Sequence, residues 1–126
     1  MKHNVKVTDF SLTPAISDYL ESRVNHLDKF ISPENKDATM CYVEIGKTTN
    51  HHKKGDLFEA EFTVHIGGKS FRAIAKEEDL YTALDIVTEE MTEELRSFKD
   101  KNVSAVKRGG AKLKSLIKSF YDRTGR

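Results

Sequence analysis

The stretch from Lys69 to Lys101 constrains the fold most, because its hydrophobic period changes partway along. Over residues 69–75 apolar and polar side chains largely alternate, which predicts a half-buried strand. From Asp79 onward apolar side chains recur every three or four residues, which predicts one face of a long helix. Asp79 is expected to cap that helix, because its carboxylate can accept hydrogen bonds from free backbone N–H groups. The apolar face consists of Leu80, Leu84, Val87, Met91, Leu95 and Phe98.

The first third of the chain predicts a strand and a second helix. Residues 3–8 alternate, and Thr13 followed by Pro14 is typical of a helix start. An apolar stripe then runs to Ile31, and residues 32–37 are expected to form a loop. Arg23, His26 and Lys29 fall on one flank of this stripe.

Two further strands are predicted between the helices. Residues 39–48 and 57–66 both alternate, and the polar residues 47–56 are expected to connect them as a hairpin. Gly67-Gly68 predicts a tight turn into the strand that begins at Lys69.

This order predicts an α+β fold, a two-layer β-α-β-β-β-α sandwich with two helices on one face of a four-stranded sheet. The hairpins make the last three strands antiparallel, and the first strand joins them by a crossover. The layout resembles that of double-stranded-RNA-binding domains. The core is expected to contain Leu20, Leu27, Phe62, Val64, Leu84, Val87 and Met91.

Charge divides the 126-residue chain into residues 1–101, one domain, and a basic tail of residues 102–126. Residues 99–126 carry nine Lys or Arg against two Asp, whereas the other 98 residues carry 12 basic and 18 acidic side chains. The tail is expected to begin with a hinge at residues 102–110 and to hold a short basic amphipathic helix at 111–121. Such tails usually bind nucleic acid, and a merely solvated tail is the alternative.

Composition excludes several classes of protein. No apolar run is long enough for a membrane helix, and the first residues lack the apolar core of a signal peptide. The lone Cys41 excludes an internal disulfide, so a cytoplasmic location is expected. No catalytic motif is present, and neither an enzyme nor a cofactor is expected. His51-His52 is a weak metal motif, and Cys41 is expected to be a core thiol.

Nucleic acid is the partner that the basic residues favour. A-form RNA is recognised by shape, with Lys and Arg on helices and loops contacting phosphates. No aromatic pair sits on one strand, which disfavours a sheet that stacks single-stranded bases. The candidate RNA-binding residues are Arg23, His26, Lys29, Arg72, Lys76, Arg96, Lys99, Lys101, Lys107, Arg108, Lys112, Lys114 and Lys118.

The chain also resembles the ribosome hibernation promoting factors, or ribosome-associated inhibitors, over roughly residues 3–101. The resemblance rests on residues 78–85, EDLYTALD, and on Asn4-Val5 followed by residues 12–16, LTPAI. It implies a protein that occupies the mRNA–tRNA channel of the small ribosomal subunit, contacts ribosomal RNA in the decoding region and blocks translation in starved cells. It implies a short form, monomeric off the ribosome, with no small-molecule substrate and no membrane.

The second helix departs from that family pattern. Glu90 and Glu93 occupy positions that are often Lys and Arg in the family, and the basic tail is expected to replace the lost charge. Two other classes stay open: a protein–protein adaptor or stress protein of the same fold that does not bind ribosomes, and a small enzyme using the histidine loop.

Overall fold

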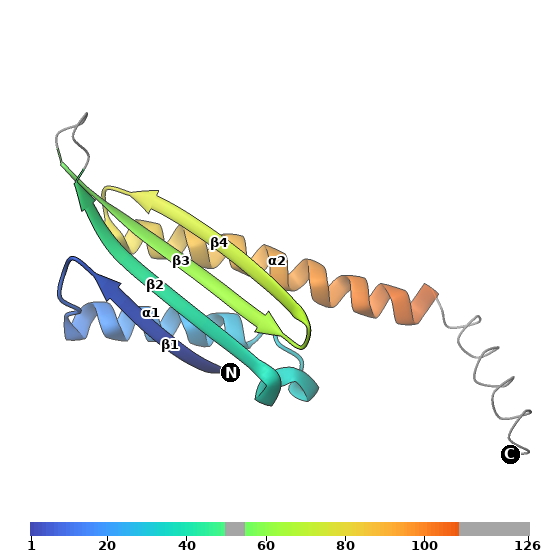
Figure 1. Cartoon of the computed structure of the whole chain (residues 1–126). Coiled ribbons are helices and arrows are strands. Elements are labelled where there is room, and N and C mark those ends of the chain that lie inside the picture. Colours follow the sequence, from blue (N-terminus) through green and yellow to red (C-terminus); the bar gives the residue numbers. More distant parts are fainter. Residues whose placement is uncertain (50–54, 109–126) are drawn as a thin grey trace, which may run out of the picture. The chain divides into compact units, whose positions relative to one another are not determined.

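The computed structural model describes residues 1–49 and 55–108, and the side chains of residues 1–48 and 55–101. Strand β1 (Lys2–Thr8) is followed by helix α1 (Pro14–Asp28), the 3-10 helix η1 (Pro33–Ala38), strands β2 (Thr39–Thr49), β3 (Asp56–Ile66) and β4 (Lys69–Glu77), and helix α2 (Leu80–Arg108). The predicted α+β sandwich is confirmed, and both helices cover one face of the sheet (Figure 1).

The sheet has the order β1-β2-β3-β4. Strand β1 pairs with β2 in parallel, whereas β2 with β3 and β3 with β4 are antiparallel, as the hairpin arrangement predicts. The turn between β3 and β4 favours glycine, because Gly67 has a φ of +58°, in the left-handed region that most other side chains disfavour. Ile66 and Lys69 close this turn as the last pair of the ladder.

The core lies between the sheet and the helices. Alternate residues of β2, β3 and β4 point toward the helices and are buried, and the apolar stripes of α1 and α2 meet them. All seven residues expected in the core are buried, with Leu84 and Phe62 fully inaccessible to solvent. Ile74, the apolar residue out of phase with its strand, is 39% exposed on the other face of the sheet.

Two predictions about the backbone were wrong. Residues 32–37 were expected to be a loop, but Pro33–Ala38 form η1, which begins at a proline whose fixed φ suits a helical first turn. Helix α2 does not end at Lys101 but continues to Arg108, so residues 102–108 of the expected hinge are helical. The expected tail helix at 111–121 lies outside the described residues.

The chain divides into two compact units, Met1–Arg96 and Ser97–Arg126. Among the helices that the structure describes, none combines the length and the apolar character needed to cross a bilayer. His51 and His52 lie outside the described residues. Within the described part of the chain, no three His, Cys, Asp or Glu side chains are grouped as metal ligands would be.

Candidate nucleic-acid interface

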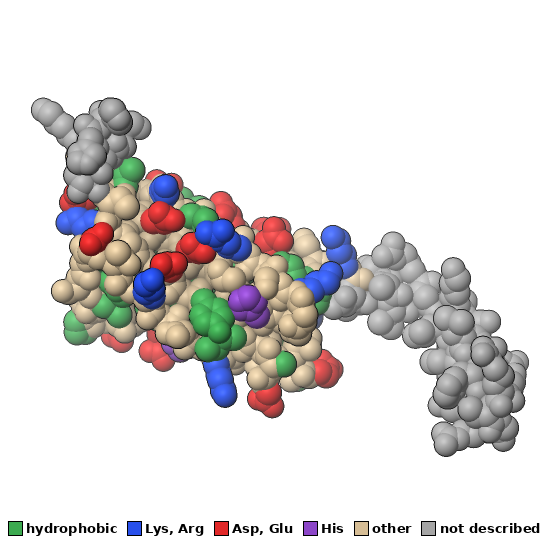
Figure 2. Space-filling model, viewed as in Figure 1, with side chains coloured by type: hydrophobic (Ala, Val, Ile, Leu, Met, Phe, Trp, Pro, Cys, Tyr) green, Lys and Arg blue, Asp and Glu red, His purple; other side chains and the backbone are tan. Residues whose placement is uncertain are grey.

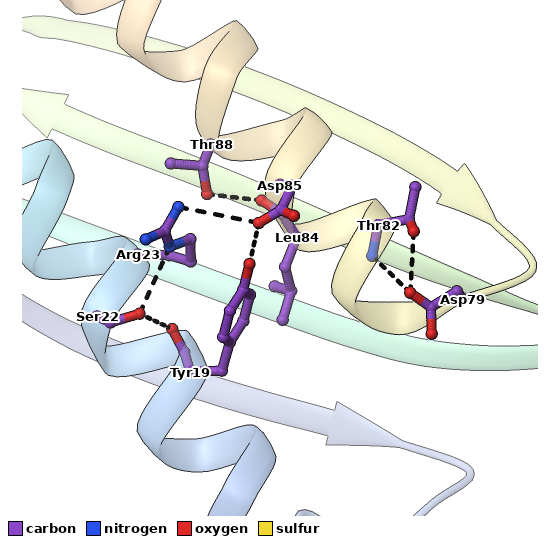
Figure 3. A network of polar contacts seen from close by, with 8 residues as sticks. All are labelled: Tyr19, Ser22, Arg23, Asp79, Thr82, Leu84, Asp85 and Thr88. Carbon is purple, nitrogen blue, oxygen red and sulfur yellow. Dashed lines mark hydrogen bonds and ion pairs between the residues drawn. The ribbon is translucent and has the colours of Figure 1, made fainter.

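Asp79 starts α2 as the sequence predicts. Its Oδ2 accepts a hydrogen bond from the backbone N–H of Thr82 at 2.9 Å and another from the Thr82 hydroxyl at 2.9 Å (Figure 3). Leu80 and Leu84, which follow in the EDLYTALD stretch, are buried against the sheet. The first part of this stretch therefore serves helix capping and packing.

Asp85, the last residue of that stretch, joins α2 to α1. Its carboxylate accepts a hydrogen bond from the Tyr19 hydroxyl and lies 3.8 Å from Nη1 of Arg23 (Figure 3). The Arg23 guanidinium also lies 5.2 Å from the centre of the Tyr19 ring, and that ring meets Tyr81 edge-on at 4.9 Å. The hydrogen bond to Asp85, together with partial burial, raises the pKa of Tyr19 above its usual value.

Arg23, a candidate RNA-binding residue, is therefore held by partners within the protein. One third of its side-chain surface remains exposed to solvent. His26 contacts Phe30 edge-on at 5.4 Å, and the Arg96 guanidinium lies 5.5 Å from the same ring. Arg96 also pairs with Glu93 at 3.3 Å, whereas Lys29 is exposed.

The helical layer of the first unit carries a net negative charge. Residues 14–28 of α1 and 80–96 of α2 together carry eight carboxylates and two arginines, which gives a net charge of −6. Glu89, Glu90, Glu93 and Glu94 are all exposed. The net negative charge of this layer disfavours the approach of a polyanion such as RNA, apart from local contacts with its cations.

The face of the sheet away from the helices is called here the open face. It carries Arg72 and Lys76, the two remaining candidate RNA-binding residues of the first unit. Arg72 Nε lies 2.6 Å from Oε1 of Glu61, and Lys76 lies 3.8 Å from Glu59. Figure 2, which views this face, shows Lys and Arg side chains interspersed with Asp and Glu. Among the described residues of the first unit, the predicted cations are therefore not gathered into one basic patch.

Strand register divides the open face into two halves. In the carboxylate half, two rows of side chains run across β1 to β4. The first row is Lys6, Glu44, Glu61 and Ile74, and the second is Thr8, Gly46, Glu59 and Lys76.

The aromatic half holds the two other rows. They are Asn4, Tyr42, Thr63 and Arg72, followed by Lys2, Met40, His65 and Ser70. None of these eight described residues carries a carboxylate. The charge of the open face is therefore polarised along the strands, with all three of its glutamates at one end.

Tyr42 and His65 form an aromatic pair that the sequence interpretation missed. Tyr42, on β2, is 44% exposed, and its ring meets the His65 ring of β3 edge-on at 5.3 Å. A hydrogen bond of 2.6 Å between Oγ of Ser70 and Nδ1 of His65 holds the imidazole on its other side. The two residues lie on different strands, so the pair could have been predicted only from the register of β2 against β3, which the hairpin between residues 49 and 56 sets.

The remaining candidates belong to the second unit. Lys99 and Lys101 are exposed on α2. Lys107 and Arg108 have helical backbones, but their side chains lie outside the described part of the chain. Lys112, Lys114 and Lys118 lie outside it altogether.

In a comparison with known proteins, residues 3–103 match the family described as "Sigma 54 modulation protein / S30EA ribosomal protein". A ribosome hibernation promotion factor of Picosynechococcus is 31% identical over 102 residues, which cover 81% of this chain and 51% of that protein. A ribosome hibernation promoting factor of Azotobacter vinelandii is 24% identical over 103 residues, covering 82% of this chain and 87% of that one. The chain thus spans about half the length of the cyanobacterial relative.

A solved structure shares the fold. The N-terminal domain of Protein Y from Thermus thermophilus superposes with a TM-score of 0.63 at 23% sequence identity. The superposition covers 78% of this chain and 99% of that domain.

Proposed function

The chain belongs to the Sigma 54 modulation protein / S30EA ribosomal protein family, and we propose that it binds ribosomes and holds them in a translationally inactive state. The observation that carries the proposal is the extent of the family match. Residues 3–103 include all but the first residue of β1 and every following element up to most of α2, so the similarity covers the whole sheet and both helices that pack on it.

The proposed site on the ribosome is the mRNA–tRNA channel of the small subunit, with ribosomal RNA as the main contact. The basic tail and the exposed cations Lys29, Lys99 and Lys101 would supply phosphate contacts. Arg23 and Arg96 would contribute less, since each is already paired with a carboxylate in the free protein.

The proposed mechanism is occupation of a binding site in the cytoplasm, without chemistry. Cys41 is fully buried, and burial raises the pKa of its thiol to about 12, which makes it a poor nucleophile. Cys41→Ser and the double variant His51→Ala/His52→Ala should therefore inhibit translation as well as the unaltered protein. Loss of inhibition by a folded variant would reopen a catalytic or metal-dependent mechanism.

The test is co-sedimentation of the full chain with purified 30S, 50S and 70S particles, combined with a cell-free translation assay. We expect association with 30S and 70S particles, competition by mRNA and tRNA, and inhibition at ratios near one protein per ribosome. Association with 50S particles alone, or binding that mRNA and tRNA leave unchanged, would contradict the proposed site. A chain that sediments with no ribosomal particle at low salt would contradict the function itself.

A further inference from the structure

The two faces of the first unit differ in charge in a way that bears on where RNA can approach. The helical layer carries a net charge of −6 over residues 14–28 and 80–96. The open face carries Lys2, Lys6, Arg72 and Lys76 against Glu44, Glu59 and Glu61, for a net charge of +1 among its described residues. Electrostatics therefore favours approach of a polyanion to the open face over approach to the helices.

Within the open face, the aromatic half is the better surface for a nucleic acid. Its eight described side chains include two cations and no carboxylate. Lys2 and Arg72 lie at opposite edges of the sheet, on β1 and β4, with Tyr42 and His65 on the strands between them. Although Glu61 pairs with Arg72, 63% of the Arg72 side-chain surface remains exposed.

The Tyr42 side chain has the properties of a stacking platform. Packing in the core does not explain an aromatic residue at this position, because Tyr42 is the most exposed large hydrophobic side chain among the described residues. The edge-on contact with His65 fixes its position, and Ser70 in turn fixes His65. Aromatic side chains that are held in place on a sheet stack unpaired bases at a low entropic cost.

A shallow depression adjoins the Tyr42 ring. Its lining includes donors from Asn4 and Lys6 and acceptors from Glu44 and Glu61. Of these, Asn4 lies in the aromatic half, and its side-chain amide offers both a donor and an acceptor to the edge of a base that stacks on the ring.

We propose that the aromatic half of the open face binds single-stranded RNA, with one base stacked on Tyr42 and the neighbouring phosphates near Lys2 and Arg72. This inference rests on the proposed ribosome binding and names a surface for it other than the helices and the tail. Duplex RNA fits this surface less well, because its bases are already stacked on one another and cannot reach the ring.

The test is fluorescence anisotropy of the full chain with a labelled, unstructured 12-nucleotide RNA, measured over a range of salt concentrations. Tyr42→Ala should weaken binding roughly 5- to 100-fold, as expected for loss of one stacked base, and should leave the salt slope unchanged. Tyr42→Phe keeps the ring and should bind within about twofold of the unaltered protein. Arg72→Gln should instead lower the slope by about 0.7.

Ile74→Ala is the matched control, because Ile74 is similarly exposed on the same face but lies in the carboxylate half. It should leave the affinity unchanged, and circular dichroism should show that all four variants are folded. An unchanged affinity of Tyr42→Ala, an equal loss in Ile74→Ala, or Tyr42-dependent binding of an acidic peptide in place of RNA would overturn the proposal.

Co-sedimentation of the same variants with 30S particles separates this inference from the proposed function. Weakened association of Tyr42→Ala supports both. If the unaltered chain and Tyr42→Ala associate equally well, the inference fails and the proposed function stands. If the unaltered chain does not associate at all, the proposed function fails, and the oligonucleotide measurements still decide whether the aromatic half binds single-stranded RNA.

Discussion

The hydroxyl of Tyr19 donates a hydrogen bond to the carboxylate of Asp85, which lies 66 positions later in the chain. This contact links α1 to α2, and the carboxylate also attracts Arg23. Asp85→Asn should lower the free energy of unfolding by about 1 kcal/mol, because the lost partners are only partly buried. Urea denaturation measures this loss.

The control for Asp85 is Glu89→Gln, an equal change of charge at an exposed position of the same helix. It should alter stability by less than about 0.5 kcal/mol. In a double-mutant cycle, Tyr19→Phe and Asp85→Asn should be non-additive, because the first removes and the second weakens the same hydrogen bond. Additive losses would show that the contact does not couple the helices.

The pKa of Tyr19 should respond to Asp85. This pKa is raised above the ordinary value for tyrosine because the hydroxyl donates a hydrogen bond to a carboxylate. A folded-state pKa above the unfolded one means that this contribution to stability is complete below about pH 10 and is lost as the pH rises through the folded-state value. Titration of ring-labelled tyrosine by NMR should show the pKa of Tyr19 fall in Asp85→Asn.

Leu84 tests the assigned face of α2. Its side chain is fully buried between the helix and the sheet, so Leu84→Ala should cost about 2–5 kcal/mol of unfolding free energy. Ile74→Ala, on the open face, should cost less than about 1 kcal/mol, because the space that it leaves at the surface is open to water and no enclosed cavity forms. Comparable losses at the two positions would contradict the assignment of the core.

Cys41 should report global unfolding. Its thiol is fully buried with a pKa of about 12, so it should resist a thiol-specific reagent at pH 8 in native buffer. Its modification rate should rise with urea in step with the fraction of unfolded chain. A Cys41→Ser/Ile74→Cys variant provides the exposed control and should react at once, whereas fast reaction of native Cys41 would contradict its burial.

The tail should act on RNA through charge. Substituting Lys112, Lys114 and Lys118 together with Gln should lower the salt slope of ribosome binding by about two, if each contacts a phosphate of single-stranded RNA. Lys36→Gln, which breaks only a pair with Asp28, should leave the slope unchanged. Equal slopes for the triple variant and the unaltered chain would show that the tail is merely solvated.

Much of the fold could be predicted because its signals are local. Alternation along β3 assigned Phe62 and Val64 to the buried face, and the cap residues Thr13 and Asp79 lie where short polar side chains precede apolar stripes. The end of α2 was missed because residues 102–108 continue the helix without the apolar period that identifies its earlier turns.

The site was harder to predict, since its contacts join distant parts of the chain. Arg23 was placed correctly on a flank of α1, but nothing near it in sequence indicates that Asp85 would hold it. Tyr42 and His65 lie 23 positions apart in the chain, and only the register of β2 against β3 brings their rings together. Charges and periods are local properties of a sequence, whereas pairing depends on the folded chain.

The parallel pairing of β1 with β2 also sets an order of folding. Ile66 pairs with Lys69 across a two-residue turn. Lys2 pairs with Met40, and the chain between these two residues includes α1 and η1. Closing the longer loop costs more chain entropy, and the contacts that repay it form later. We therefore expect the β2–β4 meander to fold first and β1 to dock last. In the native protein, the amide protons of β1 should exchange with solvent before those of β3.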